Sequence, residues 1–319
     1  MIDNKEKYRE ICRQNSTIPL FLQYWWMEAA CGPDWNVLLS YDNNGLLRGV
    51  FVYHYVKKFG QLLIVPATLT QYSGTFLFYP DNLTVESRYS FENETYNDLI
   101  WQIESLKPVF FELNFHYSQN YWQPFYWNGY SQTTRYTYRF EDISDIEVLL
   151  NGMSHRKRQK PLAKAKEGFE LRMDMTPSAF YDSYSAQLRS KGQKISYSKE
   201  TFLSIHKAAS ERGQGQIFSM YDKSDGSHAV SLFVVWDSHS AYNLVIYIDE
   251  AYRSSGASTL IICEVVKYLS AKTECYDFEG SMIKGVALKN QSFGAVLTPF
   301  SQISRISNPI LKVWRAFKR

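Results

Sequence analysis

Two carboxylates near the C-terminal end of the chain have the type and spacing best suited to chemistry on a ligand. Asp277 and Glu279 lie in the segment DFEGS, which ends at Ser281. In an extended segment residues two apart share a face, so we expect all three side chains to point the same way, toward a substrate. A carboxylate in such a position can accept a proton. The alternative is that Glu279 only caps a loop amide or pairs with Lys284.

A short glycine motif, RSSGAS, lies at the start of a stretch with helical spacing of apolar residues. Free backbone N–H groups at a helix N-terminus hold phosphate, and a glycine lets a diphosphate approach closely. The motif therefore predicts a diphosphate-binding turn, whereas a plain turn with a serine N-cap explains it without a ligand. The residues of this turn are Arg253, Ser254, Ser255, Gly256, Ala257 and Ser258.

A basic stretch, RKRQKPLAKAKEG, runs from Arg156 to Gly168. Proline is tolerated in the first turn of a helix but not in its interior, so Pro161 predicts a helix that begins near Lys160. The many cations favour a contact with phosphate groups or with tRNA, to which we expect Arg158 to contribute. A solvated linker helix is the alternative.

The elements that must position these residues follow the same order in both halves of the chain. In each half, helical material precedes three strands joined by tight turns, and a helix and a further strand follow. The first half has predicted strands at 35–41, 46–56 and 61–67, a helix at 96–105 and a strand at 109–115. The second half has predicted helices at 177–189 and 199–212, strands at 217–221, 229–236 and 241–248, a helix at 255–269 and a strand at 274–279. This duplication predicts two similar domains, 1–145 and 146–319.

This element order resembles the GNAT acyltransferase fold, and its duplication resembles the FemAB-like peptidyltransferases. Three stretches add to the resemblance: the basic helix, the RSSGAS turn, and DFEGS followed by LKNQSFGA at Leu288 to Ala295. The chain departs from the family pattern where Pro161 interrupts the basic helix and where Ser258 replaces a smaller residue. The resemblance implies an α/β fold with mixed sheets, arranged as two tandem GNAT-like domains.

The resemblance also implies an acyltransferase, in which an amine attacks a thioester or an aminoacyl ester and passes through an oxyanion to an amide. Glu279 would accept the amine proton, and Lys289 would neutralise negative charge on the donor or the intermediate. An exposed salt bridge is the alternative explanation of Lys289. The donor would be an acyl-CoA, such as acetyl-CoA, or an aminoacyl-tRNA, used as a co-substrate and not held tightly.

Four further residues are assigned to substrate binding. Tyr242 and Tyr247 lie on the predicted strand at 241–248, where a phenol can orient an acyl group, although most of the 24 tyrosines must be structural. Gln71 and Tyr72 follow the third strand and resemble the segment with which FemAB-like proteins approach their acceptor. A polar loop that ends a hydrophobic strand explains these two equally well.

The composition argues against several other classes of protein. The chain has 319 residues, is 45% hydrophobic and has a formal net charge of +3, too weak a bias to indicate DNA binding. Its four cysteines have no paired spacing and no histidine cluster beside them, so we expect neither a metal site nor a disulfide framework. The first residues are polar and lack the apolar run of a secretory signal, so we expect a cytoplasmic protein.

The C-terminal segment Asn308 to Arg319 has the spacing of an amphipathic helix. It predicts either docking on the protein or a peripheral membrane contact, which would suit a lipid-linked acceptor. The acceptor is otherwise a small-molecule amine, such as a cell-wall or polysaccharide precursor, and no residue indicates the acyl group or the oligomeric state. A catalytically silent module that binds a glycan or a nucleotide-bearing ligand is the second hypothesis, and an interaction protein is the third.

Overall fold

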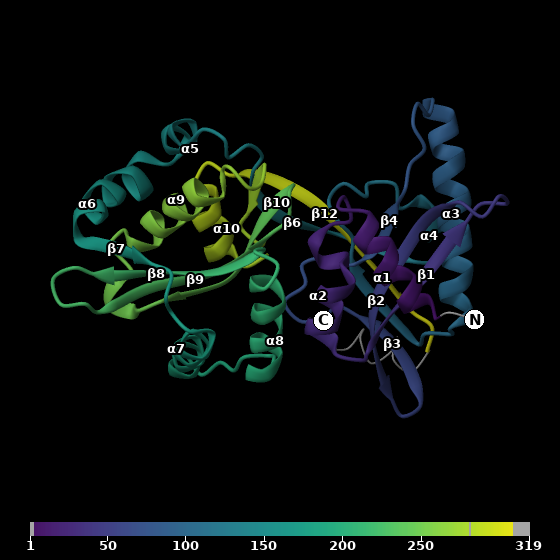
Figure 1. Ribbon diagram of the computed structural model, residues 1–319, viewed down its shortest axis with the longest axis horizontal. Helices are drawn as coiled ribbons and strands as arrows, with labels where there is room; N and C mark the ends of the chain where they lie inside the picture. Colours follow the sequence, from purple (N-terminus) through teal and green to yellow (C-terminus); the bar gives the residue numbers. More distant parts are fainter. Residues whose placement is uncertain (1–2, 281, 309–319) are drawn as a thin grey trace. The chain divides into compact units, whose positions relative to one another are not determined.

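The chain forms two compact units in the computed structural model, which describes residues 3–280 and 282–308 (Figure 1). The units are Met1–Arg135 together with Pro299–Arg319, and Tyr136–Thr298. Strand β6 (Ser131–Phe140) carries the chain out of the first unit, and β12 (Val296–Ile306) carries it back. The sequence prediction placed the division after residue 145 and assigned the whole C-terminal part to the second domain.

The sheet of the first unit is organised around its long strand β2. The strand order is β1-β2-β3-β5-β12, and the first half of β2 also pairs with β4. β3 and β5 are parallel, with Leu63 opposite Phe110. The strand β4 was missed in the sequence because it is short and begins with a glycine. The strands are β1 (Trp35–Tyr41), β2 (Leu47–Lys58), β3 (Gln61–Val65), β4 (Gly74–Leu77) and β5 (Phe110–Asn114).

The main helix of the first unit is α3 (Val85–Ser105), which packs its second half on the sheet through Tyr96, Leu99 and Ile103. The prediction began this helix at Tyr96. Its earlier turns are polar and lack apolar spacing, and they are started by Thr84, whose hydroxyl accepts a hydrogen bond from the Ser87 N–H. The other helical segments are α1 (Asn4–Gln14), the 3₁₀ turn η1 (Leu20–Leu22), α2 (Tyr24–Cys31) and α4 (Gln123–Trp127).

The sheet of the second unit has the strand order β6-β11-β10-β9-β8-β7. Its antiparallel meander of β8, β9 and β10 confirms the three predicted strands, and β9 is buried at all but its first residue, as expected of a central strand. The strands are β7 (Phe169–Arg172), β8 (Gly215–Asp222), β9 (His228–Trp236), β10 (Ser240–Ile248) and β11 (Cys275–Asp277).

Helices cover both faces of this second sheet (Figure 1). α9 (Ala257–Leu269) lies on one face with ten of its thirteen residues buried, whereas α7 (Pro177–Ser190) and α8 (Lys199–Ser210) cover the other. Phe202 of α8 stacks on Phe180 of α7 and contacts Phe233 of β9. The remaining helical segments are α5 (Ile146–Gly152), the π-helical turn η2 (His155–Gln159), α6 (Lys160–Gly168), the 3₁₀ turn η3 (Glu250–Tyr252) and α10 (Lys284–Gln291).

Strands β10 and β11 pair in parallel over only three positions, from Ser240 opposite Cys275 to Tyr242 opposite Asp277. β10 then bulges against β9 between Asn243 and Val245 and continues without β11 beside it. The prediction that the last strand runs on to Glu279 was wrong, because β11 ends at Asp277. Strand alternation therefore does not align the side chains of Asp277 and Glu279, as had been predicted.

Candidate functional site

Asp277 anchors the turn that follows β11. It is fully buried, and its Oδ1 accepts hydrogen bonds from the hydroxyl of Thr137 on β6 and from the backbone N–H of Glu279, the latter at 2.8 Å. The second bond makes the chain turn directly after the strand. Thr137 lies 140 residues away in the sequence, so no local pattern could have assigned it.

Glu279 occupies this turn with a left-handed backbone, φ +54°. Its Oε1 is buried and has no hydrogen-bond partner among the described residues. Burial, and secondly the negative charge of Asp277, raise the pKa of the Glu279 carboxyl well above its usual value. In residues 3–280 and 282–308 no ion pair joins Glu279 to Lys284, and its carboxyl caps no loop amide. Both structural alternatives to a functional role are thus absent from the described part of the chain.

Gly280 lets this turn lie directly against β6. A Cβ atom at Gly280 would lie 1.9 Å from the carbonyl oxygen of Tyr136 and 2.3 Å from Cα of Thr137. A side chain has no room at such distances. The glycine of the DFEGS segment therefore holds Glu279 close to the strand that carries Thr137.

Lys289 lies on α10. Burial, and secondly the positive charge of Arg158, lower the pKa of its ammonium group to about 8. No carboxylate of the described residues lies within ion-pair distance of Lys289. The surface salt bridge that was the alternative explanation is thus not found there.

Arg158 is a second cation of this region, and no carboxylate of the described residues forms an ion pair with it. Its guanidinium donates to Ser292 Oγ at 2.7 Å, to Thr259 Oγ1 at 3.1 Å and to the carbonyl oxygen of Lys289 at 3.3 Å. It also stacks on Phe293, 4.0 Å from the ring centroid. Burial lowers its pKa to about 10. All its described partners are neutral, so Arg158 and Lys289 together leave an excess of positive charge that suits an anionic ligand.

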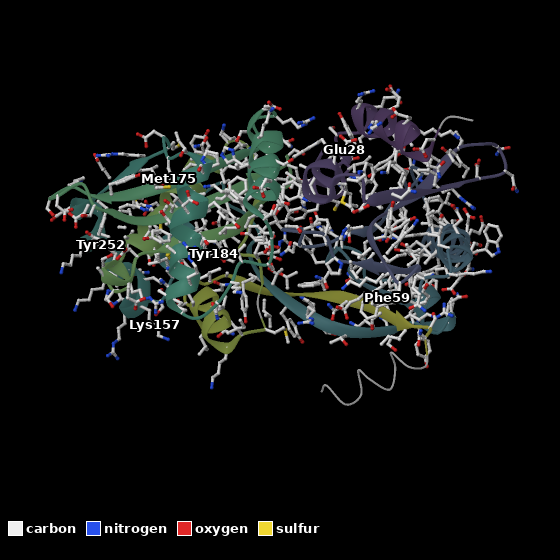
Figure 2. The ribbon with its side chains drawn as sticks, turned by 90° about the horizontal axis from the view of Figure 1, so that it is seen from below. Glu28, Phe59, Lys157, Met175, Tyr184 and Tyr252 are labelled. Carbon is white, nitrogen blue, oxygen red and sulfur yellow. The ribbon has the colours of Figure 1, made fainter. Side chains whose placement is uncertain are left out.

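The basic stretch begins with the π-helical turn η2, and α6 begins at Lys160 as predicted. Lys157, labelled in Figure 2, is exposed. The other exposed cations of the stretch are Arg156, Lys160, Lys164 and Lys166. None of these five forms an ion pair within the described residues, so their charges are available to a partner.

The RSSGAS turn precedes α9, whose N-cap is Gly256 at φ +87°. A Cβ atom at Gly256 would lie 2.3 Å from the carbonyl oxygen of Pro161 in α6, so packing alone requires a glycine there. Ala257, Ser258 and Thr259 are buried, and the first turn of α9 is covered by α6. The glycine of the predicted diphosphate site thus has a purely structural explanation. Arg253 pairs with Glu250 at 2.7 Å on the surface.

The two predicted tyrosines of β10 differ in their surroundings. Tyr242 is buried and lies opposite Asp277 in the strand register. Tyr247 stacks on His228 and donates to Asp249 Oδ2 at 3.1 Å, and burial raises its pKa to about 12. Five residues of strand place it roughly 15 Å from Tyr242. The structure therefore brings Tyr242, but not Tyr247, beside Asp277.

Gln71 and Tyr72 lie in the first unit, just before β4. The carbonyl oxygen of Gln71 accepts from Asn114 Nδ2 at 3.1 Å. Tyr72 is buried, with its ring 4.4 Å from that of His116 and 5.1 Å from that of Phe21. Two sequence predictions, Ser281 and the helix at 308–319 beyond Asn308, fall outside the described residues.

The described residues contain no group of three or more His, Cys, Asp or Glu arranged to hold a metal ion. All four cysteines are free thiols. Across 3–280 and 282–308, no helix is long and apolar enough to cross a membrane.

Comparison with solved structures identifies the architecture. FemX aligns over 100% of this chain and 99% of its own, with a TM-score of 0.69 and 12% identity. A tandem GNAT protein from the clavulanic acid biosynthesis pathway aligns over 95% of this chain and 94% of its own, with a TM-score of 0.52 and 10% identity. This chain has the fold of FemX and of this tandem GNAT protein. L-PGS from Bacillus licheniformis is also similar, over 97% of this chain and 93% of its own, with a TM-score of 0.56 and 10% identity. No protein-family model and no curated protein sequence matches the chain.

Proposed function

We propose that the second unit transfers an aminoacyl group from aminoacyl-tRNA to an amine, with Glu279 as the proton acceptor. The observation that carries this proposal is the buried Glu279 carboxyl, whose Oε1 lacks a hydrogen-bond partner in the described structure and whose pKa is raised. A carboxylate with an ordinary pKa is a weak base toward an ammonium group. A raised carboxyl pKa lies closer to the pKa of the ammonium group, so the proton transfer becomes easier. The fold, which is similar to that of FemX and of a tandem GNAT protein, supports an acyltransferase-type reaction.

The proposed reaction needs no covalent enzyme intermediate. The amine nitrogen forms a bond to the acyl carbon, and the bond from that carbon to the ribose oxygen of the donor breaks. The proton lost by the amine passes to Glu279, which then returns it to the departing ribose oxygen, so that the carboxylate is regenerated. Arg158 and Lys289 supply positive charge for the phosphates of the donor or for the oxyanion.

Two observations favour an aminoacyl-tRNA over an acyl-CoA. The first turn of α9, on which a coenzyme A diphosphate would rest, is buried under Pro161 and Arg158. The exposed cations of 156–166 lack acidic partners in the described residues, and such a surface attracts a polyphosphate backbone.

The donor is tested by titrating the protein with aminoacyl-tRNA at about 50 and 200 mM salt. We expect binding to weaken steeply with salt, and Arg158→Gln to weaken it further. Lys267→Gln is the matched control, because Lys267 is exposed on α9 and already paired with Glu264. A rise in melting temperature with acetyl-CoA, together with tRNA binding that Arg158→Gln leaves unchanged, would replace the aminoacyl-tRNA by an acyl-CoA.

Turnover is tested with tRNA charged with a labelled amino acid and a panel of soluble and lipid-linked amines. We expect a product that survives mild base, because an amide resists the treatment that hydrolyses the donor ester. Glu279→Gln should bind tRNA normally and form product about 10²- to 10⁴-fold more slowly. Binding without turnover on every amine would favour the catalytically silent module instead.

A further inference from the structure

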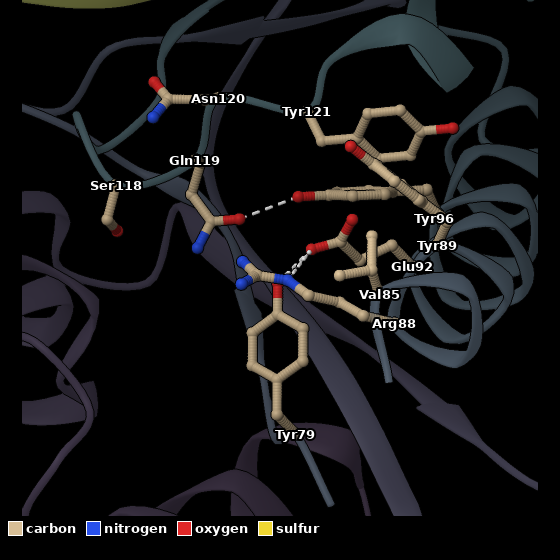
Figure 3. A pocket seen from close by; sticks show the side chains of 10 residues that line it. All are labelled: Tyr79, Val85, Arg88, Tyr89, Glu92, Tyr96, Ser118, Gln119, Asn120 and Tyr121. Carbon is tan, nitrogen blue, oxygen red and sulfur yellow. Dashed lines mark hydrogen bonds and ion pairs between the residues drawn. The ribbon is translucent and has the colours of Figure 1, made fainter. Parts of the chain in front are cut away.

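The first unit contains a pocket of about 350 Å³ that plays no part in the proposed transfer (Figure 3). Its walls come from three places: the first turns of α3, Tyr79 beyond the end of β4, and residues 118–121 in the loop after β5. All three belong to the same unit. The size is that of sites that enclose a small molecule.

A buried carboxylate, Glu92, lies at the centre of this pocket with its side chain only 4% exposed. Its Oε1 accepts from the hydroxyl of Tyr79 at 2.6 Å and from Nε of Arg88 at 3.0 Å. Among the described residues nothing donates to its second oxygen, Oε2. In Figure 3 the dashed lines reach only the other oxygen. Glu92 thus has one acceptor available, while Arg88 cancels its charge.

The donors of the pocket are held in place by a second set of bonds. The buried Tyr96 donates to Oε1 of Gln119 at 2.7 Å, which leaves the Gln119 amide nitrogen as a donor. Figure 3 shows this nitrogen on the same side of the pocket as the Arg88 guanidinium. Acceptor and donors are therefore fixed before any ligand arrives.

Aromatic rings form the remaining walls. Tyr79 and Tyr89 are 40% and 50% exposed. Tyr89 lies 5.3 Å from Tyr121, whose hydroxyl donates to Asn93 Oδ1 at 2.7 Å. Exposed rings that are held in this way offer apolar faces on which a flat ligand can stack.

We propose that this pocket binds a neutral, hydroxyl-rich ligand, a saccharide unit. A sugar ring offers apolar C–H faces to the tyrosines, and its hydroxyls both donate to Glu92 and accept from Gln119 and Arg88. An anion would be repelled by the buried Glu92. A cation would be repelled by Arg88, whose guanidinium already lies over the Tyr79 ring at 4.9 Å. The cancelled charges and the alternating donors and acceptors therefore select an uncharged polyol.

The test is saturation-transfer NMR on the full chain with methyl glucoside and N-acetylglucosamine as neutral probes. Glucosamine and glucuronate are the charged comparisons. We expect saturable binding of at least one neutral sugar and weaker binding of both charged ones. Preference for a charged sugar, or no signal from any of the four, would overturn the proposal.

Two variants locate the site. Tyr89→Ala removes an exposed ring, and Gln119→Glu removes the donor amide while leaving an acceptor for the Tyr96 hydroxyl, so neither change opens the core. We expect each to weaken sugar binding at least fivefold while the melting temperature stays near that of the parent. Tyr126→Ala is the matched control, because Tyr126 is 63% exposed and lies outside the pocket. Equal binding by all three variants would place the sugar elsewhere and overturn the proposal.

Discussion

Both units have a three-strand meander that precedes a helix and a further strand, but they use that helix in opposite ways. In the second unit α9 is part of the core, with ten of thirteen residues buried and its first turn covered by α6. In the first unit only six of the twenty-one residues of α3 are buried, and its first turns line an open pocket. The start of this helix is therefore covered in one unit and open in the other, and a ligand can reach only the open one.

The carboxylates of the two units differ in the same way. Glu92 in the first unit is matched by Arg88 and Tyr79. Glu279 in the second has a buried oxygen without a partner in the described residues and lies near Asp277. A matched carboxylate stabilises the fold and an unmatched one costs stability, so the second is the better candidate for a group retained for its chemistry.

Exchanging each of these carboxylates for an amide should give the largest difference between the two units. We expect Glu279→Gln to lower the transfer rate by about 10²- to 10⁴-fold without loss of stability. Glu92→Gln should lower the free energy of unfolding by about 1–3 kcal/mol and leave transfer unchanged. Turnover assays and denaturant titrations of both variants give the answer. A stable, fully active Glu279→Gln protein would remove Glu279 from the mechanism.

The pH profile of transfer should report the shifted groups of the second unit. Glu279 acts as the base only when ionised, so the rate should rise about tenfold per pH unit until its raised pKa is passed. Lys289 supplies charge only when protonated, so the rate should fall above pH of about 8. Lys289→Gln should lose the falling limb. A profile with the same falling limb in that variant would assign it to another group.

The free energy of unfolding of the second unit should also depend on pH through Glu279. Because the pKa of Glu279 is raised by folding, its contribution is fully present below the pKa of the unfolded chain, about 4.3, and is lost as pH rises through the folded pKa. Glu279→Gln should therefore gain stability over the parent as pH increases toward 8. A constant difference across this range would mean that Glu279 ionises normally.

A substitution at Gly256 distinguishes a packing role of this glycine from a role in ligand binding at α9. We expect Gly256→Ala to cost about 1–3 kcal/mol, because the new Cβ would meet the Pro161 carbonyl and φ is +87°. Gly226→Ala, at φ +74° in the turn before β9 with open space around it, should cost about 1 kcal/mol. Thermal unfolding measures both. Equal losses would show that α6 moves aside easily, and would reopen this turn as a diphosphate site.

The smallest expected effect concerns two half-buried histidines, His228 and His206, on the α7 and α8 face of the second sheet. Burial lowers the pKa of His228 and of His206. Their contribution to stability is present above the unfolded pKa of about 6.5 and is lost as pH falls through the lowered folded pKa. His228→Asn should flatten this dependence, whereas His155→Gln, at an exposed position, should not. An unchanged slope in His228→Asn would show that His228 is protonated in the folded protein.

Local signals in the sequence were sufficient for most of the architecture. Alternating apolar strands and turns such as Asp42 to Gly45 indicated both meanders, and Pro161 correctly placed the start of α6 at Lys160. The polar first half of α3 and the short strands β4 and β7 were missed, because they carry too little periodic apolar pattern to be seen.

The sites depended on contacts that local spacing does not encode. DFEGS pointed to Asp277 and Glu279, yet the extended geometry predicted for them was replaced by a turn that Thr137 supports from 140 residues away. Arg158 was expected to hold phosphate, but its partner Ser292 lies 134 residues further on. The pocket around Glu92 gave no signal in the sequence.

The order of helices and strands was thus determined by the sequence alone, because hydrophobic periodicity and turn residues act over a few neighbouring positions. Only the tertiary structure decided three further features. These are the pairing of Glu92 but not Glu279 with a cation, the packing of Gly256 against Pro161, and the covering of the start of α9. These features depend on groups that folding brings together across more than a hundred residues. Burial removes these groups from water and thereby shifts their pKa values.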